Sequence, residues 1–185
     1  HAGYMLVGVI AAFHVQEMAT NALLFYLAAY LLASYAVFGV MTWNAGKNDA
    51  EQTLDDYLDF GQKNPALGFV LVIGLASLTG IPPLAGFIGK LLLFIAAWKA
   101  GLTTLLFISV IGVATSIFYY FGWIQEATFK FWKTKDSTAT EETQVPAKTP
   151  SIAPGYLWAL IFLATATVIL GFYQEFLPIL GTAGK

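Results

Sequence analysis

Lys90 is the side chain of this sequence whose type and position most clearly predict chemistry. It is the single charged residue in an apolar run of about 33 residues that begins after Pro65 and ends near Trp98. If Trp98 marks a membrane interface, Lys90 lies eight residues before it, and its ammonium begins about 12 Å inside, near the middle of the bilayer. A charge at that depth is costly, and such residues usually mark paths for ions or protons.

The residues just before this lysine predict a break in the helix. A straight helix over the whole run would reach about 50 Å, whereas the hydrocarbon core of a bilayer is about 30 Å thick. Pro82 and Pro83 lack an N–H, and Pro82 disfavours the helical conformation at Ile81. Gly80 and Gly86 permit unusual backbone angles or close packing.

Irregular backbone persists at membrane depth only where it is buried in protein or lines a watery cavity. The break and the lysine together therefore predict an ion pathway. The alternative is an ordinary proline kink, with a lysine that reaches out to the lipid headgroups.

Polar residues on other segments could line such a pathway. Small and polar side chains recur at helical spacing in the segment after the turn at 99–101, at Ser109, Gly112, Ser116 and Tyr119. Because that turn is short, the two segments that it joins should be antiparallel neighbours. The hydroxyl groups could then hold a chain of water near Lys90, although helix packing explains the spacing equally well. We also include Thr79 and His1 among the candidate lining residues.

The composition predicts an all-α membrane protein. The chain is 58% hydrophobic and 11% charged, with a mean hydropathy of +0.70, whereas an average soluble domain has about 25% charged residues. It has no cysteine to ligate an iron–sulfur cluster, only two histidines, and no phosphate-binding or dinucleotide motif. We therefore expect no cofactor in this chain. A net charge of −2 without basic blocks gives no reason to expect nucleic-acid binding.

The apolar segments predict a bundle of transmembrane helices with one broken helix at Gly80 to Pro83. The first segment is too short to span, so we interpret it as the tail of a helix whose beginning lies upstream. The expected segments are 1–13, 22–43, the broken 65–98, 102 to about 123, and 156 to about 177. A polar stripe of Tyr26, Tyr30 and Ser34 on the second segment is more typical of helix packing than of ion transport.

Two polar segments separate these helices. In residues 44–64, the spacing of Leu54, Tyr57, Leu58 and Phe60 predicts a short amphipathic helix on the surface, and the acidic residues there are best explained as a solvated face. Residues 135–154 are rich in Thr, Ser, Ala, Glu and Pro, a composition that predicts a flexible loop.

The lysines predict the orientation in the membrane. The loops 44–64 and 124–155 fall on one side and carry most of the lysines near helix ends, namely Lys47, Lys63, Lys130, Lys133 and Lys135. Lys99 and Lys185 lie on the other side. By the positive-inside rule, the two loops are cytoplasmic and the C-terminus is on the outer side.

The stretch from Ser77 to Lys90, which reads SLTGIPPLAGFIGK, resembles the broken-helix motif of the antiporter-like membrane subunits of respiratory complex I. Subunits of multi-subunit sodium/proton antiporters share this motif. The segments HAGYMLVG at 1–8 and YLAAYL at 26–31 further resemble the branch called N in bacteria. The likeness extends from His1 to about Trp132, with a last helix in the expected place.

This resemblance implies a domain organisation and a role for one residue. Residues 1–132 would be the C-terminal part of the antiporter-like helical repeat, with three full spans and a truncated first helix. Residues 133–155 would be a flexible loop, and 156–185 the last transmembrane helix and tail. The family assigns proton transfer to the lysine at the position of Lys90, and its partner lysine and glutamate would lie upstream.

The expected function is that of a proton-translocating membrane subunit of an NADH:quinone or related oxidoreductase. Its expected partners are other membrane subunits, the lipid bilayer and protons, and its expected location is the inner (cytoplasmic) membrane. Any redox chemistry would belong to another chain. Two alternatives stay open: a subunit of a sodium/proton antiporter, and a scaffold subunit in which Lys90 only pairs with a carboxylate of a neighbour.

Overall fold

The computed structural model describes residues 1–45, 57, 60–128 and 152–172, and within these ranges it contains helices and turns but no strand. The helices are α1 (Ala2–Ala12), α2 (Gln16–Ala45), α3 (Phe60–Lys63), α4 (Pro65–Thr79), α5 (Ala85–Lys99), α6 (Thr103–Thr128) and α7 (Pro154–Phe172). Three of them, α2, α6 and α7, are long and apolar enough to cross a membrane. The predicted all-α membrane fold is confirmed.

The predicted break is also confirmed, and its first residue shows why the helix stops. Helix α4 ends at Thr79, and Gly80 has a left-handed backbone with φ 91° and ψ 45°. The N–H of Gly80 and that of Ile81 both donate to the carbonyl of Ala76, at 3.0 and 2.9 Å. These bonds are typical of a helix that closes on a glycine. The chain resumes helical structure at Ala85, after an extended Leu84, and the Pro82–Pro83 peptide bond is cis.

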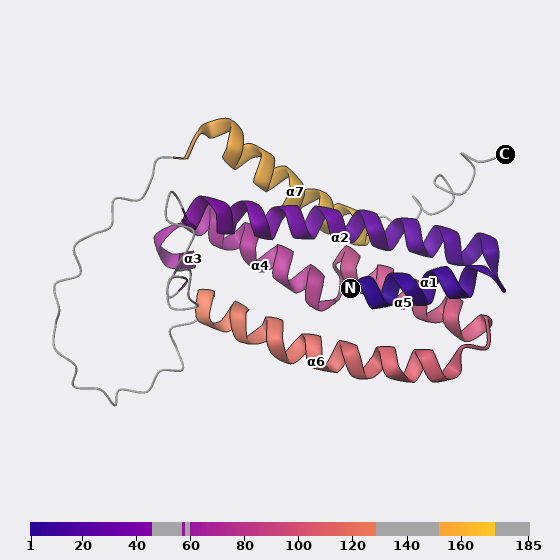
Figure 1. Cartoon of the computed structure of the whole chain (residues 1–185). Coiled ribbons are helices and arrows are strands. Elements are labelled where there is room, and N and C mark those ends of the chain that lie inside the picture. Colours follow the sequence, from indigo (N-terminus) through magenta and orange to yellow (C-terminus); the bar gives the residue numbers. More distant parts are fainter. Residues whose placement is uncertain (46–56, 58–59, 129–151, 173–185) are drawn as a thin grey trace, which may run out of the picture.

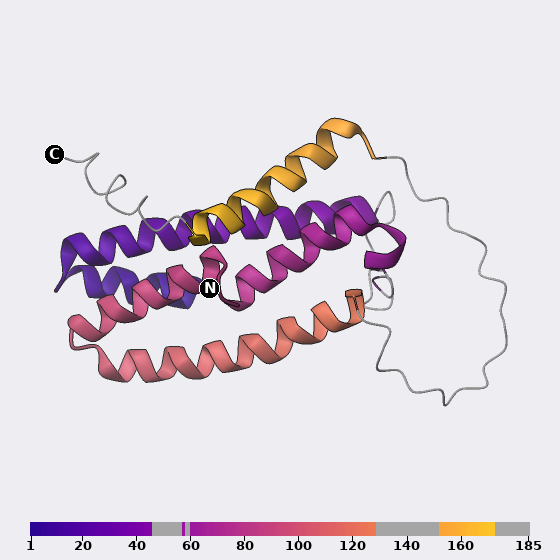
Figure 2. The same ribbon diagram turned by 180° about the vertical axis from the view of Figure 1, so that it is seen from behind.

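Helix α2 is the centre of the bundle. It contacts α1, α4, α5 and α7, and in Figure 1 it runs the full length of the molecule above the broken helix. The two halves α4 and α5 follow one another beneath it and meet near its middle. Helix α1 packs against α2 and α5, and the first residue of the chain sits at the level of the break, as the view from behind also shows (Figure 2).

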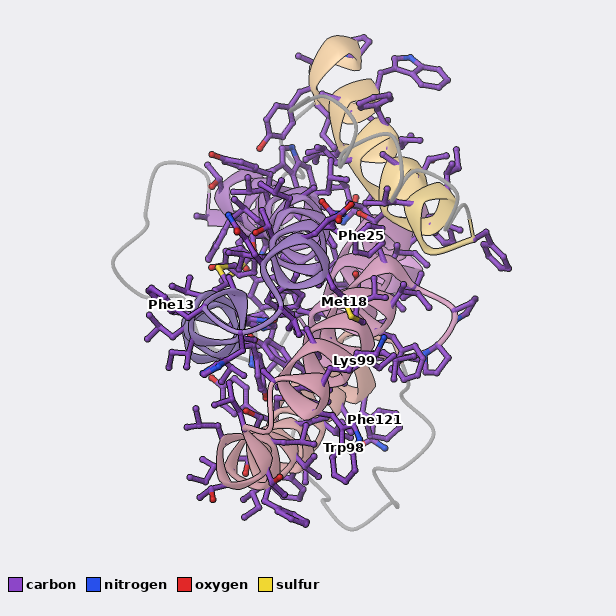
Figure 3. The ribbon with its side chains drawn as sticks, turned by 90° about the vertical axis from the view of Figure 1, so that its right-hand side faces the viewer. Phe13, Met18, Phe25, Trp98, Lys99 and Phe121 are labelled. Atoms are coloured by element: carbon purple, nitrogen blue, oxygen red, sulfur yellow. The ribbon has the colours of Figure 1, made fainter. Side chains whose placement is uncertain are left out.

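The helix ends divide into two groups, in agreement with the topology expected from the sequence. The C-terminal ends of α2 and α6 and the N-terminal ends of α4 and α7 lie at one end of the bundle (Figure 1). The α1–α2 and α5–α6 turns lie at the other end, which Figure 3 views with Phe13 and Lys99 labelled. Helix α6 returns antiparallel beside the broken helix and contacts both α4 and α5.

The expectation of a surface helix within 44–64 is partly wrong. Tyr57 and Phe60 are buried in the main core, where the Tyr57 ring lies 5.5 Å from that of Trp123 on α6. Among the described residues of this segment, the helix is the single turn α3, and the rings of Tyr57 and Phe60 pack near Trp123 of α6 and Trp43 of α2. Leu54, Leu58 and the acidic residues of the segment lie outside the described residues, as do residues 133–151 of the predicted loop 133–155 and the end of the last segment after residue 172.

Candidate functional site around Lys90

Lys90 is buried, and its ammonium is bound by the end of the other half-helix. Its side chain is 3% exposed, and Nζ donates hydrogen bonds to the carbonyls of Leu78 at 2.9 Å and Thr79 at 2.8 Å. These two residues close α4, and the last carbonyls of a helix have no partner within it. They carry the partial negative charge of the helix dipole, which favours a cation at this point.

Gly80 leaves room for the lysine side chain in addition to ending α4. A Cβ atom at position 80 would lie 3.2 Å from Lys90 Nζ and 3.3 Å from its Cδ. Such contacts are tight, and the backbone angle of Gly80 is one that other residues rarely adopt. The predicted importance of this glycine therefore has two separate physical reasons.

Ser77 joins the two half-helices, which the sequence analysis missed. The N–H of Gly86, in the first turn of α5, donates to Ser77 Oγ at 3.1 Å. Leu84 at the N-cap provides no side-chain cap, so a residue of α4 satisfies this donor of α5. A Cβ at Gly86 would overlap the Ser77 carbonyl oxygen, so the helices can cross here only because position 86 is glycine. The available signal was a serine nine residues before a glycine within an apolar run.

A cluster of one histidine and several tyrosines adjoins the lysine. His1 Nδ1 is 2.7 Å from the hydroxyl of Tyr26, and His1 Nε2 is 3.4 Å from the hydroxyl of Tyr120. The ring of Tyr4 lies 5.4 Å from Lys90 Nζ, within the range of a cation–π contact. Imidazole and hydroxyl groups can both donate and accept hydrogen bonds, so this cluster can exchange protons or bind water.

The other predicted lining residues differ in whether they contact Lys90 or the cluster of His1 and tyrosines. Thr79 is buried, and its hydroxyl donates to the carbonyl of Leu75 while its own carbonyl accepts from Lys90. The hydroxyls of Ser109 and Ser116 donate to carbonyls of their own helix, those of Leu105 and Val113. Ser116 also lies near the hydroxyl of Tyr4, so the α6 face does approach the cluster.

Tyr119 lies on the outside of the described helices, so its inclusion among the lining residues stays a prediction. Its side chain is 64% exposed, and the adjacent Tyr120 is the tyrosine of α6 that reaches His1. The helical spacing in the sequence did not indicate Tyr120, which lies one residue further along α6. One residue corresponds to about 100° around a helix, enough to turn a side chain from the interior to the outside.

The break residues themselves are less buried than the lysine. Pro82 and Pro83 are exposed, and Ile81 is half-buried, whereas Leu84, Ala85 and Gly86 are buried. Among the residues that the structure describes, no group of three or more His, Cys, Asp or Glu side chains could hold a metal ion.

Comparison with known proteins places this arrangement in a family. The family described as NADH:quinone oxidoreductase/Mrp antiporter, transmembrane, matches residues 1–116. NADH-quinone oxidoreductase subunit N 1 of Opitutus terrae is 50% identical over 174 residues, which are 94% of this chain and 34% of that protein. NADH-quinone oxidoreductase subunit N of Salinibacter ruber is 36% identical over 177 residues, again 94% of this chain and 34% of that protein.

A solved structure supports the same relationship. A chain in respiratory complex I from Thermus thermophilus with bound aureothin superposes with a TM-score of 0.73 and 27% sequence identity, over 96% of this chain and 37% of that chain. The present chain spans about a third of the length of the curated relatives reported above. The family match covers more than half of its residues, and the chain therefore belongs to the NADH:quinone oxidoreductase/Mrp antiporter transmembrane family.

Proposed function

We propose that this chain forms part of a proton-translocating membrane subunit of an NADH:quinone oxidoreductase complex, with Lys90 as the group that accepts and releases the transported proton. The observation that carries the proposal is the binding of a buried ammonium by two backbone carbonyls at the break of a helix. A carboxylate partner would hold the ammonium through a full negative charge. The carbonyls at a helix end carry only a partial charge, so they hold the ammonium less firmly.

The two protonation states of Lys90 would differ in how the half-helices are joined. The charged form makes two charge-assisted hydrogen bonds to Leu78 and Thr79, which are stronger than bonds from a neutral amine. Loss of the proton weakens this contact, and the carbonyls become available to water. The His1 and tyrosine cluster lies next to the ammonium and provides groups that donate and accept protons on one side.

The names of the relatives support the oxidoreductase over the antiporter alternative. Both curated relatives reported above are named NADH-quinone oxidoreductase subunit N. In this role the chain acts beside other membrane subunits, and electron transfer takes place in other chains of the complex. The subunit resides in the inner (cytoplasmic) membrane, with the segments 44–64 and 124–155 on the cytoplasmic side and the C-terminus on the outer side.

The test is proton pumping by the assembled complex with Lys90→Ala in its full-length subunit. We expect the variant complex to assemble and to pump far fewer protons per electron, measured as proton uptake by inverted membrane vesicles during NADH oxidation. Lys99→Ala is the matched control, because Lys99 lies on the same helix but is exposed at its end. Equal pumping by the two variants would refute the role proposed for Lys90.

A further inference from the structure

The last helix touches the break through its backbone. Gly171 on α7 is buried, and a Cβ atom built on it would overlap the carbonyl oxygen of Pro83. The same atom would lie 2.8 Å from the amide nitrogen of Ala85 and 2.8 Å from the carbonyl carbon of Leu84. In Figures 1 and 2, the yellow end of α7 reaches the bundle at this point. The glycine therefore allows α7 to lie directly on the segment that joins α4 to α5.

The rest of α7 is anchored to the same bundle. Leu160 and Ala164 are buried in the main core together with residues of α2 and α4. Leu170, beside Gly171, packs against the buried cluster of Phe25 and Ala29 on α2 and Ala85 on α5. One face of α7 thus fixes the helix to α2 and α4, while its final turn presses against the first residues of α5.

We propose that α7 clamps the break, and that Gly171 is a positioning residue that sets where α5, and Lys90 with it, lies relative to the carbonyls of α4. This inference rests on the proton-relay role proposed above for Lys90. It assigns to the last helix a part in that role through packing against the break.

The geometry of the break explains why this contact matters. Lys90 reaches Leu78 and Thr79 across two helices that are joined by the non-helical residues 80–84. The segment has few hydrogen bonds of its own, one of which runs from Leu84 N to Ile81 O at 3.1 Å. A displacement at residues 83–85 is therefore transmitted to α5. Because Gly171 meets backbone atoms, rotation of a side chain cannot relieve an added methyl group.

Gly39 of α2 provides a matched control, because it also packs against α7. A Cβ at Gly39 of α2 would overlap Cδ2 of Leu160 on α7, so an alanine there also disturbs the packing of α7. The atom that it meets is the end of a flexible side chain, and it lies away from the break. Gly39→Ala and Gly171→Ala thus both alter the contacts of α7, but only the second presses on the backbone of residues 83–85.

The first measurement is hydrogen exchange of the backbone amides in the full complex, followed in peptides that cover residues 81–92. We expect Gly171→Ala to speed exchange severalfold at the start of α5 and Gly39→Ala to leave it unchanged. Leu170→Ala serves as a second variant that loosens the same contact without any overlap, in case Gly171→Ala fails to assemble. Unchanged exchange in Leu170→Ala and in any assembled Gly171→Ala would overturn the clamp.

The second measurement is proton pumping per electron, alone and in combination with Lys90→Ala. A positioning residue that acts through Lys90 lowers pumping in the wild-type background and adds no further loss in the Lys90→Ala background. Pumping by Gly171→Ala equal to that of Gly39→Ala, together with a defect in Lys90→Ala, would overturn the clamp and leave the proposed function standing. Normal pumping by Lys90→Ala would instead refute the proposed function, while hydrogen exchange still decides whether α7 holds the break.

Discussion

At the scale of single residues, the main finding is the chemical nature of the partner of Lys90. The end of a helix carries the equivalent of roughly half an elementary charge, less than a carboxylate. Leu78 and Thr79 therefore offset part of the cost of a buried ammonium without fixing it as a full ion pair would. A group held in this way responds to small changes in its surroundings, which a relay requires.

Ser77 gives a prediction at this scale. Ser77→Ala removes the acceptor of the Gly86 N–H at a fully buried position, and an unsatisfied buried donor costs about 1–3 kcal/mol. We expect a lower thermal midpoint of the detergent-solubilised full-length subunit. Ser109→Ala is the control, because the Ser109 hydroxyl only donates to a carbonyl of its own helix. If both variants melted at the same temperature as the wild type, the hydrogen bond from Gly86 to Ser77 would not stabilise the contact between the half-helices.

At the scale of elements, α4 and α5 act as two half-helices that overlap at their ends. Each has 15 residues, a length of about 22 Å, which is short of the hydrocarbon thickness of about 30 Å. Their contact at Ser77 and Gly86 places the start of α5 beside the end of α4. Lys90, in the second turn of α5, can therefore reach the last carbonyls of α4.

Gly86 tests this crossing of the half-helices. Gly86→Ala introduces a methyl group that would overlap the Ser77 carbonyl oxygen and lie 2.9 Å from its Oγ, so we expect a marked loss of the assembled subunit in membranes. At Gly122 of α6 an added Cβ meets nothing within 4 Å, and alanine is favoured over glycine in a helix by about 1 kcal/mol. On an immunoblot of membranes, the amount of the assembled Gly122→Ala subunit should equal that of the wild type. A normal amount of the Gly86→Ala subunit would contradict the close crossing of the two half-helices.

The sequence allowed the break to be predicted but not the contacts around it. Gly80 and the two prolines act through local backbone conformation, which can be read from neighbouring residues. The bond from Gly86 to Ser77 and the reach of Tyr120 to His1 depend on how separate helices rotate against one another. For the same reason the burial of Tyr57 could not be predicted from the sequence.

At the scale of the whole molecule, the two ends of the bundle differ in the number of lysines in the segments that adjoin them. The ends of α2, α4, α6 and α7 that adjoin the lysine-bearing segments lie together, and Lys99 lies at the opposite end (Figure 1). The chain spans about a third of the length of the relatives reported above, and the polarity is described for that length alone.

Labelling of introduced cysteines tests the orientation. The sequence has no cysteine, so a single one reports its own position in this chain. In sealed cells, Thr140→Cys should resist a membrane-impermeant thiol reagent that is added outside, whereas Lys99→Cys should react. The reverse pattern would show that the lysine-bearing segments lie on the outer side.

The most direct test of the central claim is proton pumping by the full complex with Lys90→Arg. A guanidinium keeps a positive charge but does not release its proton in proteins. We therefore expect Lys90→Arg to assemble and to pump as poorly as Lys90→Ala, measured as protons translocated per electron in inverted vesicles. A scaffold role needs only the fixed charge beside the carbonyls of Leu78 and Thr79. Full pumping by the arginine variant would therefore contradict a proton relay through Lys90.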